Sequence, residues 1–341
     1  MPHASILLSH LPTQIHGDEL PFRMLIRSVE FLQSHGLFAV TSAGQPHWDC
    51  ILSVIIRYNI PAHVILPKQI PPSYLDEQFQ FANNSNNVIT TAIVPSREQR
   101  DRIICEQPDY VIPIWLRDKG HLASYLANVN GAKIETHFNC SEYNFETSVK
   151  YEVPEPSDRI RLLPSDYIWH WTRATIGAWS GETAYQFWSD RLFTNNPPHN
   201  ALMTLIRIIC ERRLRASGEH IAGNEPVVAF TENHPSSPVT TETMLRWRQR
   251  RHRMNFEPYA IGIPQQDAIA RSTKPIKYGG ERSWDTMQTG KTWQQEREWR
   301  HRGDFILDKE CLKNAIVIVR EKNEIEKVKQ FFDGKVYAYG E

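Results

Sequence analysis

The fold is decided by one stretch near the start of the chain, Leu37-Phe38-Ala39-Val40-Thr41-Ser42-Ala43-Gly44-Gln45-Pro46-His47-Trp48-Asp49. Its first four residues form an apolar run that predicts a strand, and the small residues after it predict a loop. Apolar residues at helical spacing precede the run from Phe22 to Leu32, and Gly36 supplies a stop for that helix. A further apolar-periodic stretch follows from Cys50 to Tyr58. The order is therefore helix, strand, loop and a second apolar element.

The same alternation continues to about residue 137. The pattern predicts strands at 62–66, 110–116 and 133–137, a polar helix at 97–106 and a helix that ends at Asn130. Alternating strands and helices indicate a parallel sheet covered by helices on both faces. Such sheets bind ligands beyond the carboxyl ends of their strands, where loops and helix N-termini present backbone donors to phosphates. The candidate nucleotide-binding residues are Ser42, Gly44, Asp49, Arg97 and Gly120.

This arrangement resembles the SLOG superfamily, which includes DNA-processing protein A and lysine-decarboxylase-like nucleotide enzymes. The resemblance covers roughly residues 5–137. It rests on Ala39 to Gly44 with Trp48-Asp49, Val64 to Pro67, Arg97 to Asp101, and Asp109 to Gly120. It implies a Rossmann-like domain with a nucleotide ligand. The chain lacks the Pro-Gly-Gly-x-Gly-Thr phosphate loop of the hydrolytic branch, so ligand sensing is favoured over catalysis there.

Two alternatives remain open for the N-terminal residues. In the first, Gly44 only permits a turn, Asp49 caps a helix, and Arg97 and Arg100 are solvated. In the second, the domain is a nucleotide hydrolase or sensor centred on Gly44 and Asp49, and the rest of the chain is its scaffold.

Length and composition limit the remaining classes of protein. A chain of 341 residues exceeds the size of one core, so we expect domains at 1–138 and 166–341 with a linker at 139–165. The 39 basic and 39 acidic residues balance, so no global field recruits nucleic acid or a membrane. The five cysteines include no Cys-x-x-Cys pair, and no apolar run approaches the roughly 18 residues of a membrane span. These features favour a cytoplasmic protein without metal or membrane partner, and they leave a homo-oligomer open.

The second half predicts an α+β domain. Strands are expected at 167–172, 227–231, 259–263, 276–278, 293–300 and 315–319, with helices at 201–216 and 322–332. Strands mixed irregularly with helices favour this class over a second doubly wound sheet.

Two motifs in this half carry ionisable groups, Trp169-His170-Trp171-Thr172-Arg173 and Glu296-Arg297-Glu298-Trp299-Arg300. Side chains alternate faces along a strand, so a strand at 293–300 places Glu296, Glu298 and Arg300 on one face. A solvent-facing edge strand has the same alternation, and a lone histidine is more often a hydrogen-bonded core residue. The two motifs together indicate a shared site.

The motifs resemble those of mono-ADP-ribosyltransferases, which have a split α+β sheet with a His or Arg on an early strand and a Glu on a late one. The resemblance spans about 165–310. It implies that His170, Thr172 and Arg173 bind NAD, with Tyr259 and Arg300 as further cofactor-binding candidates. It makes Glu298 the group that stabilises the oxocarbenium-like centre, with Glu296 acting on the acceptor and His170 completing the catalytic set.

The middle element of the transferase pattern has three candidates, Phe230-Thr231-Glu232, Tyr259 and Tyr278. The Phe-Thr-Glu strand and the Glu-Arg-Glu-Trp-Arg ending are also similar to poorly characterised bacterial families, some of them linked to phage defence. The resulting hypothesis is a two-domain effector, in which a nucleotide-binding domain controls NAD-consuming transfer to protein or nucleic acid.

A basic stretch supports a non-enzymatic alternative. Guanidinium groups contact phosphates, and neighbouring aromatic rings stack on unpaired bases. The candidate nucleic-acid patch consists of Arg246, Arg248, Arg250, Arg251 and Arg253. Since the net charge is zero, a solvated helix face explains the same residues slightly better.

Overall fold

The structure is a computed structural model. It describes residues 1–340 except 10, 12–16, 80–88, 145–152, 175–176, 180, 195–198, 219–220, 222–223, 248–255, 280, 282 and 288–293, and it leaves out the side chains of Trp247 and Met287. The chain divides into two compact units. The N-terminal unit comprises Met1–Val149 and Ile176–Pro198, and the C-terminal unit comprises Lys150–Thr175 and His199–Glu341. The chain therefore passes between the units three times.

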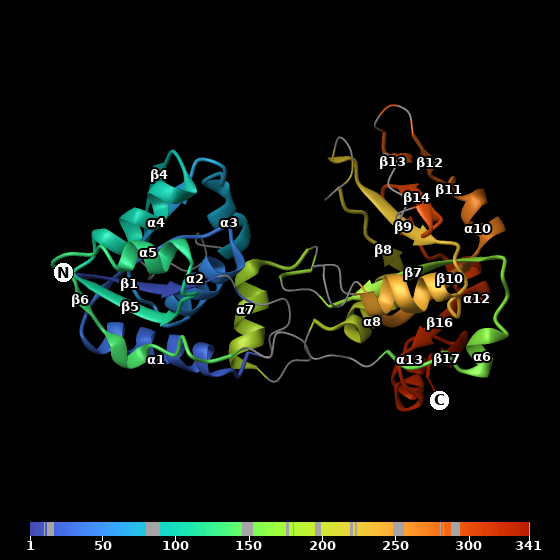
Figure 1. The fold of residues 1–341 in the computed structure, drawn as a ribbon, viewed down its shortest axis with the longest axis horizontal. Helices are drawn as coiled ribbons and strands as arrows, with labels where there is room; N and C mark the ends of the chain where they lie inside the picture. Colours follow the sequence, from blue (N-terminus) through green and yellow to red (C-terminus); the bar gives the residue numbers. More distant parts are fainter. Residues whose placement is uncertain are drawn as a thin grey trace. The chain divides into compact units, whose positions relative to one another are not determined.

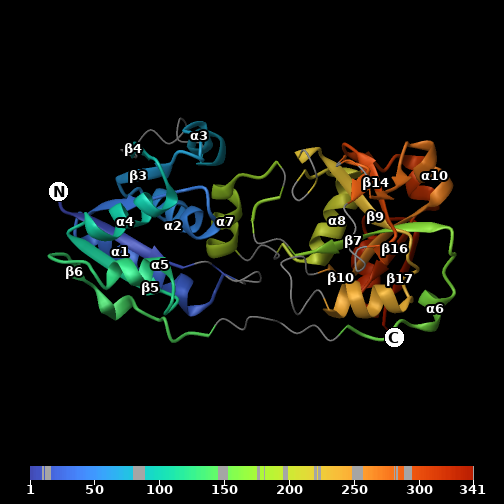
Figure 2. The same cartoon turned by 45° about the horizontal axis from the view of Figure 1, so that its top comes forward.

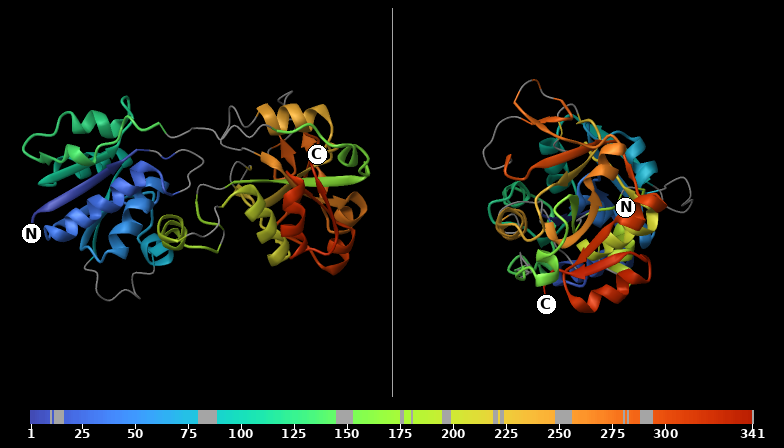
Figure 3. Two further views of the ribbon diagram at one scale, coloured as in Figure 1. Left: turned by 90° about the horizontal axis from the view of Figure 1, so that it is seen from below. Right: turned by 90° about the vertical axis from the view of Figure 1, so that its right-hand side faces the viewer.

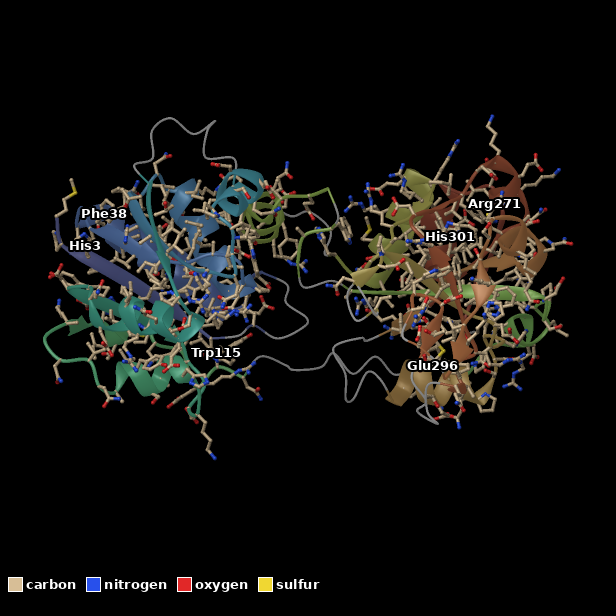
Figure 4. All side chains as sticks on the ribbon, turned by 90° about the horizontal axis from the view of Figure 1, so that it is seen from above. His3, Phe38, Trp115, Arg271, Glu296 and His301 are labelled. Atoms are coloured by element: carbon tan, nitrogen blue, oxygen red, sulfur yellow. The ribbon has the colours of Figure 1, made fainter. Side chains whose placement is uncertain are left out.

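The N-terminal unit is built on a six-stranded parallel sheet (Figure 1). The strands lie in the order β4-β3-β2-β1-β5-β6. Their bounds are His3–Leu8 (β1), Phe38–Thr41 (β2), Ala62–Pro67 (β3), Ile89–Val94 (β4), Tyr110–Trp115 (β5) and Lys133–Ile134 (β6). His3 and Phe38 meet edge to face at the amino ends of their strands, while Trp115 ends β5 at the opposite edge (Figure 4).

Helices cover both faces of this sheet. The helix α1 (Leu20–Ser34) packs against α2 (Pro46–Arg57) over one face, and α4 (Arg97–Glu106) packs against α5 (His121–Leu126) over the other (Figures 1 and 2). Two further helices complete this unit: α7 (Ala184–Phe193) packs against α2, and α3 (Ser73–Phe79) packs against α7. The 3-10 turn η2 (Thr136–Phe138) follows β6. Because α2, α4 and α5 each follow a strand, their N-termini lie at the carboxyl edge of the sheet.

The segment with α7 completes the N-terminal core. Phe187 and Trp188 are buried with Phe22, Trp48 and the apolar strand residues of the sheet. Thr183 caps α7 with a reciprocal capping box to Gln186, which starts the helix where its apolar face meets α2. This core segment comes from residues 176–198, a part of the chain that the sequence analysis gave to the second domain.

The C-terminal unit contains a mixed seven-stranded sheet in the order β11-β14-β9-β7-β10-β16-β17. All neighbours are antiparallel except β16 and β17. The strand bounds are Tyr167–Arg173 (β7), Val227–Thr231 (β9), Phe256–Pro264 (β10), Lys274–Pro275 (β11), Glu298–Arg302 (β14), Ile316–Val319 (β16) and Lys335–Ala338 (β17). Two small pairs lie outside this sheet, β12 (Lys277–Tyr278) with β13 (Thr286–Met287), and β8 (Arg213–Leu214) with β15 (Phe305–Ile306).

Each face of this sheet has its own core. One face packs Ile168, Phe230 and Trp299 under α8 (Ala201–Glu211), and the other packs Trp169 and Trp171 with residues of the π-helical segment η4 (Val239–Trp247). Figure 3, left, shows α8 (yellow) and η4 (orange) on opposite sides of the sheet. The remaining elements are α6 (Asp158–Arg161), α10 (Gln265–Ala270), α12 (Lys309–Asn314), η5 (Lys322–Glu324) and α13 (Ile325–Lys329).

These sheets confirm the predicted α/β plus α+β class. The strands and helices expected before residue 137 are present, but two are shorter than predicted: the strand expected at 133–137 is only Lys133–Ile134, and the helix expected to end at Asn130 ends at Leu126. The strand at 227–231 and the strand that begins at Tyr167 are also present. The helix expected at 201–216 ends at Glu211, because Arg212 adopts a left-handed conformation with φ 50°. No described helix is long and apolar enough to cross a membrane.

Candidate functional site

The loop between β2 and α2 brings three of the candidate nucleotide-binding residues together. Ser42 is buried, and its hydroxyl donates to the carbonyl of Ile65 at 2.8 Å. Gly44 has φ 84°, and its N–H donates to Oδ1 of Asp49 at 2.7 Å. A side chain at Gly44 would also collide with Ile70, since a Cβ would lie 2.6 Å from its Cδ1. Glycine is therefore required for this loop to close over the first turn of α2.

Asp49 lies in the first turn of α2 and is almost fully buried. Burial raises the pKa of its carboxyl to about 7, against the opposing effect of hydrogen bonds from the Gly44 N–H and the Tyr74 hydroxyl. The Tyr74 bond to Oδ2 is 2.9 Å long. The charge of the loop therefore changes near neutral pH.

One of the alternatives for the N-terminal residues predicts that Arg100 is solvated, and this prediction is wrong. Only 2% of its side chain is exposed, so it is not solvated. Its Nε donates to Asp101 at 2.8 Å, and its Nη2 donates to the side-chain oxygen of Gln45 at 3.0 Å. The guanidinium carbon lies 5.3 Å from the centre of the Trp48 ring. Arg100 therefore reaches from α4 to the N-terminus of α2.

The N-terminus of α2 is left without a side-chain cap. Gln45 occupies the N-cap position but caps no N–H, because its side-chain oxygen accepts from Arg100 instead. Pro46 occupies the first helical position. An uncapped helix N-terminus attracts anions through its backbone donors and the helix dipole.

Basic groups from two helices gather around Asp101. Arg97, Arg100 and His121 all act on this one carboxylate, although burial has the larger effect and raises its pKa. Arg97 lies in the first turn of α4, and His121 begins α5 directly after Gly120. Two of the candidates, Arg97 and Gly120, therefore lie at the same edge as the loop of Ser42 and Gly44.

Two buried donors at this edge lack an acceptor among the described residues. They are Nη1 of Arg100 and Nε1 of Trp48, both shielded from solvent. A buried donor without a partner costs about 1–3 kcal/mol, and more when it is charged. Burial lowers the pKa of Arg100, with Asp101 opposing the shift. Because each donor destabilises the fold when it has no acceptor, the presence of two of them at one edge of the sheet requires an explanation.

In the C-terminal unit, the strand expected at 293–300 begins at a later residue than predicted. The strand β14 begins at Glu298, and residues 288–293 lie outside the described residues. Arg297 has φ 47°, a left-handed conformation that interrupts extended backbone. The alternation therefore holds for Glu298 and Arg300 but does not extend to Glu296, which lies in the preceding turn.

His170 and Glu298 lie on opposite faces of the sheet. In the register of the sheet, Trp169 is opposite Thr231, and Thr231 is opposite Glu298. Residues paired across antiparallel strands point to the same face, so Glu298 shares a face with Trp169. His170, one residue further, contacts Phe230 on the other face at a ring distance of 5.8 Å. The structure therefore does not bring the two expected catalytic residues together.

Three polar side chains meet beside β14, and the carboxylate of Glu296 is near enough to affect one of them electrostatically. Arg300 holds Glu298 with two hydrogen bonds, 2.6 Å from Nε to Oε1 and 3.3 Å from Nη2 to Oε2. The Tyr278 hydroxyl is hydrogen-bonded to the backbone of Glu298. Burial raises the pKa of Tyr278, and the nearby carboxylates of Glu298 and Glu296 raise it further. We define Glu296, Glu298, Arg300 and Tyr278 as the β14 cluster.

The end of β9 holds the turn of Glu296 in place. The Thr231 hydroxyl donates to the Glu296 carbonyl at 2.5 Å, and the Asn233 side chain donates to the Gln295 carbonyl at 2.7 Å. The Glu296 side chain is 8% exposed. Figure 4 shows Glu296 well away from His301 of the same unit, whose ring packs in the other core.

The remaining cofactor-binding candidates have structural partners. The Thr172 hydroxyl donates to the carbonyls of Ala201 and Tyr259, at 2.9 and 3.3 Å. The Tyr259 hydroxyl donates to Glu324 at 2.8 Å, and the Arg173 carbonyl accepts from Thr204 at 3.2 Å. His170 bonds the Ala229 carbonyl through Nδ1 at 2.9 Å, and burial lowers its pKa. Thr172, Tyr259 and His170 share the face opposite to the β14 cluster.

The basic patch is described only at Arg246. Its guanidinium pairs with Glu155 at 2.6 Å and with Glu242 at 2.5 Å, so its charge is already compensated. Arg248, Arg250, Arg251 and Arg253 lie outside the described residues.

Glu257 on β10 is a buried carboxyl that the sequence analysis missed. It is 2% exposed, it accepts the Ala174 N–H, and its Oε1 has no partner within the described parts of the chain. Burial raises its pKa from 4.5 to about 7, with Arg320 opposing and Glu324 adding to the shift.

Replacing Glu257 by glutamine is expected to stabilise the protein above pH 7. A carboxyl with a raised pKa in the folded chain binds more protons when folded, so stability falls as the pH rises from 4.5 to about 7. The variant should gain about 3 kcal/mol over wild type at pH 8 and nothing at pH 4. Thermal unfolding at the two pH values measures this, with the exposed Glu326→Gln as control. Identical pH profiles for wild type and Glu257→Gln would contradict it.

Comparison with protein-family models, with curated proteins and with solved structures finds no match for this chain. Within the described residues, no group of three or more His, Cys, Asp or Glu side chains could hold a metal ion.

Arg100 had a signal in the sequence that could have indicated its burial. It precedes the buried residue Ile104 by four positions, so the two lie on the same face of α4. His121, Gln45 and Tyr278 carry no comparable signal, because their roles depend on contacts between distant segments.

Proposed function

We propose that the N-terminal unit binds a nucleotide at the carboxyl edge of its parallel sheet and that this binding regulates the chain. The supporting observation is the grouping of Arg97, Arg100 and His121 around Asp101, beside the uncapped N-terminus of α2. An anion at this edge gains from the local positive charge and from the helix dipole.

The test is a binding panel on the full chain. Isothermal titration with adenosine, AMP, ADP and ADP-ribose should detect at least one ligand, and thermal unfolding should show a matching rise in the midpoint. Wild-type protein that binds none of them would overturn the proposal.

The affinity for ADP-ribose is expected to fall as the pH rises from 6 to 8. Asp49 becomes ionised around pH 7 and then repels the pyrophosphate, while the ligand has no terminal phosphate that titrates in this range. Asp49→Asn should remove the pH dependence and keep the higher affinity. Titrations of both proteins across this interval measure the effect, and a variant that keeps the wild-type slope would contradict it.

As a second candidate, we propose NAD-consuming transfer or hydrolysis at the β14 cluster, controlled by the nucleotide-binding unit. The observation in its favour is that Glu298 is held in one orientation by Arg300, with Glu296 and Tyr278 beside it. A fixed carboxylate stabilises a developing oxocarbenium ion, because its charge is oriented before the barrier is reached. This candidate no longer assigns a role to His170. The acceptor is a protein or a nucleic acid, or water in the hydrolytic case.

A further inference from the structure

We propose that Arg100 and Trp48 bind a phosphoryl group of the N-terminal ligand, so that the ligand is recognised through its phosphates and not mainly through its base. The inference rests on the proposed nucleotide-binding function. It adds the class of ligand group and the two residues that bind it.

The first argument is the pair of unused donors. Nη1 of Arg100 and Nε1 of Trp48 have no acceptor in the described part of the structure, and both belong to side chains that are at least 98% buried. The guanidinium carbon lies 5.3 Å from the Trp48 ring centre, so the two donors belong to one locality. A group that satisfies both must offer several acceptor oxygens.

The second argument is charge. Nε of Arg100 donates to Asp101 and Nη2 donates to Gln45, so these bonds fix the orientation of the guanidinium, and Nη1 is left without an acceptor among the described residues. Arg97, in the first turn of the same helix, adds a second positive charge near the Asp101 carboxylate. A phosphoryl group is anionic and has three acceptor oxygens, which matches an arginine donor, an indole donor and the backbone donors of an uncapped helix N-terminus.

The third argument is that the hydrogen bonds within the fold do not use every donor of this guanidinium. A guanidinium needed only to link α4 to α2 would be satisfied by Asp101 and Gln45, and its remaining nitrogen would reach solvent. Here the remaining nitrogen is enclosed and unpaired. A buried site with this pattern is prepared for an anion.

The experiment compares ADP with adenosine on the full chain by isothermal titration. Wild type should bind ADP at least about 100-fold more tightly than adenosine. Arg100→Gln should lower the ADP affinity to that for adenosine and leave the adenosine affinity unchanged. Trp48→Phe keeps an aromatic side chain and removes the indole donor, so it should weaken ADP binding about 10-fold. Arg102→Gln is the matched control, since Arg102 is on the same helix, is exposed, and pairs with Glu98 and Glu106 on the helix surface.

The outcomes separate the two proposals. If wild type binds adenosine and ADP equally, or if folded Arg100→Gln binds ADP as wild type does, the phosphate assignment is overturned and nucleotide binding survives. If wild type binds no probe, the proposed function fails together with this inference. Circular dichroism establishes folding. If Arg100→Gln does not fold, Arg100→Lys replaces it, with an expected 10-fold loss of ADP affinity and an unchanged adenosine affinity.

Discussion

Replacing Glu298 by glutamine is expected to reduce NAD consumption by about 100-fold or more. The substitution keeps the size of the side chain and removes the charge that stabilises the oxocarbenium ion. The loss should be in kcat, because a charge developed only at the transition state contributes little to ground-state binding. The measurement is nicotinamide release from NAD, together with label transfer to protein and nucleic acid.

Two controls sharpen this experiment. His170→Ala should leave turnover within about 3-fold of wild type, because His170 lies on the opposite face of the sheet and contacts Phe230. Glu310→Gln changes an exposed carboxyl and should have no effect. If wild type releases no nicotinamide, or if Glu298→Gln turns over as wild type does, the enzymatic candidate is excluded. If His170→Ala lost most of its turnover and Glu298→Gln did not, the active site would lie on the face of the sheet that carries His170.

Replacing Gly262 by alanine is expected to destabilise the C-terminal unit by about 3 kcal/mol. Gly262 lies on β10 directly opposite Trp169 on β7. A Cβ there would lie 2.5 Å from Cζ3 of Trp169 and 2.7 Å from its Cε3. The indole is 1% exposed and packs in the core of Leu163, Ala260 and Ile316, so it has no room to move. Thermal or denaturant unfolding of the C-terminal unit measures the loss.

A double-mutant cycle tests the cause. Trp169→Leu removes the atoms that clash with the new Cβ, although it also destabilises the unit by losing buried apolar surface. In this background, Gly262→Ala should lower the free energy of unfolding much less than in wild type. A coupling of at least about 1 kcal/mol is expected. Equal costs of Gly262→Ala in the two backgrounds would contradict a steric origin.

The N-terminal fold follows from local signals because its strands are short, apolar and covered on both faces. The strand at Phe38–Thr41 and the helix at Pro46–Arg57 are examples. The edge strand β4 was not predicted, because the exposed Thr90-Thr91 pair interrupts the apolar residues of Ile89–Val94 and leaves no clear strand period. The helix α7 was also missed, since its burial depends on α2, which lies far away in the sequence.

The geometry of the C-terminal site depends on register, which a single sequence does not carry. Within β14, successive side chains point to opposite faces of the sheet as predicted, so Glu298 and Trp299 lie on different faces. The relation between strands is set by the pairing of Trp169 with Thr231 and of Thr231 with Glu298. A slip of one residue between β7 and β9 would have placed His170 in the row of Glu298. The left-handed Arg297 was equally hidden, because Glu-Arg-Glu-Trp-Arg has the period of a strand throughout.

The three passages of the chain between its units have a consequence for inheritance. Because Phe187 and Trp188 complete the N-terminal core from within residues 176–198, no single recombination breakpoint separates the two units intact. A gene fusion that joined the first 165 codons to another partner would leave that core open on the side of α2. The two units are therefore expected to be inherited as one piece, with changes in one retained or lost together with the other.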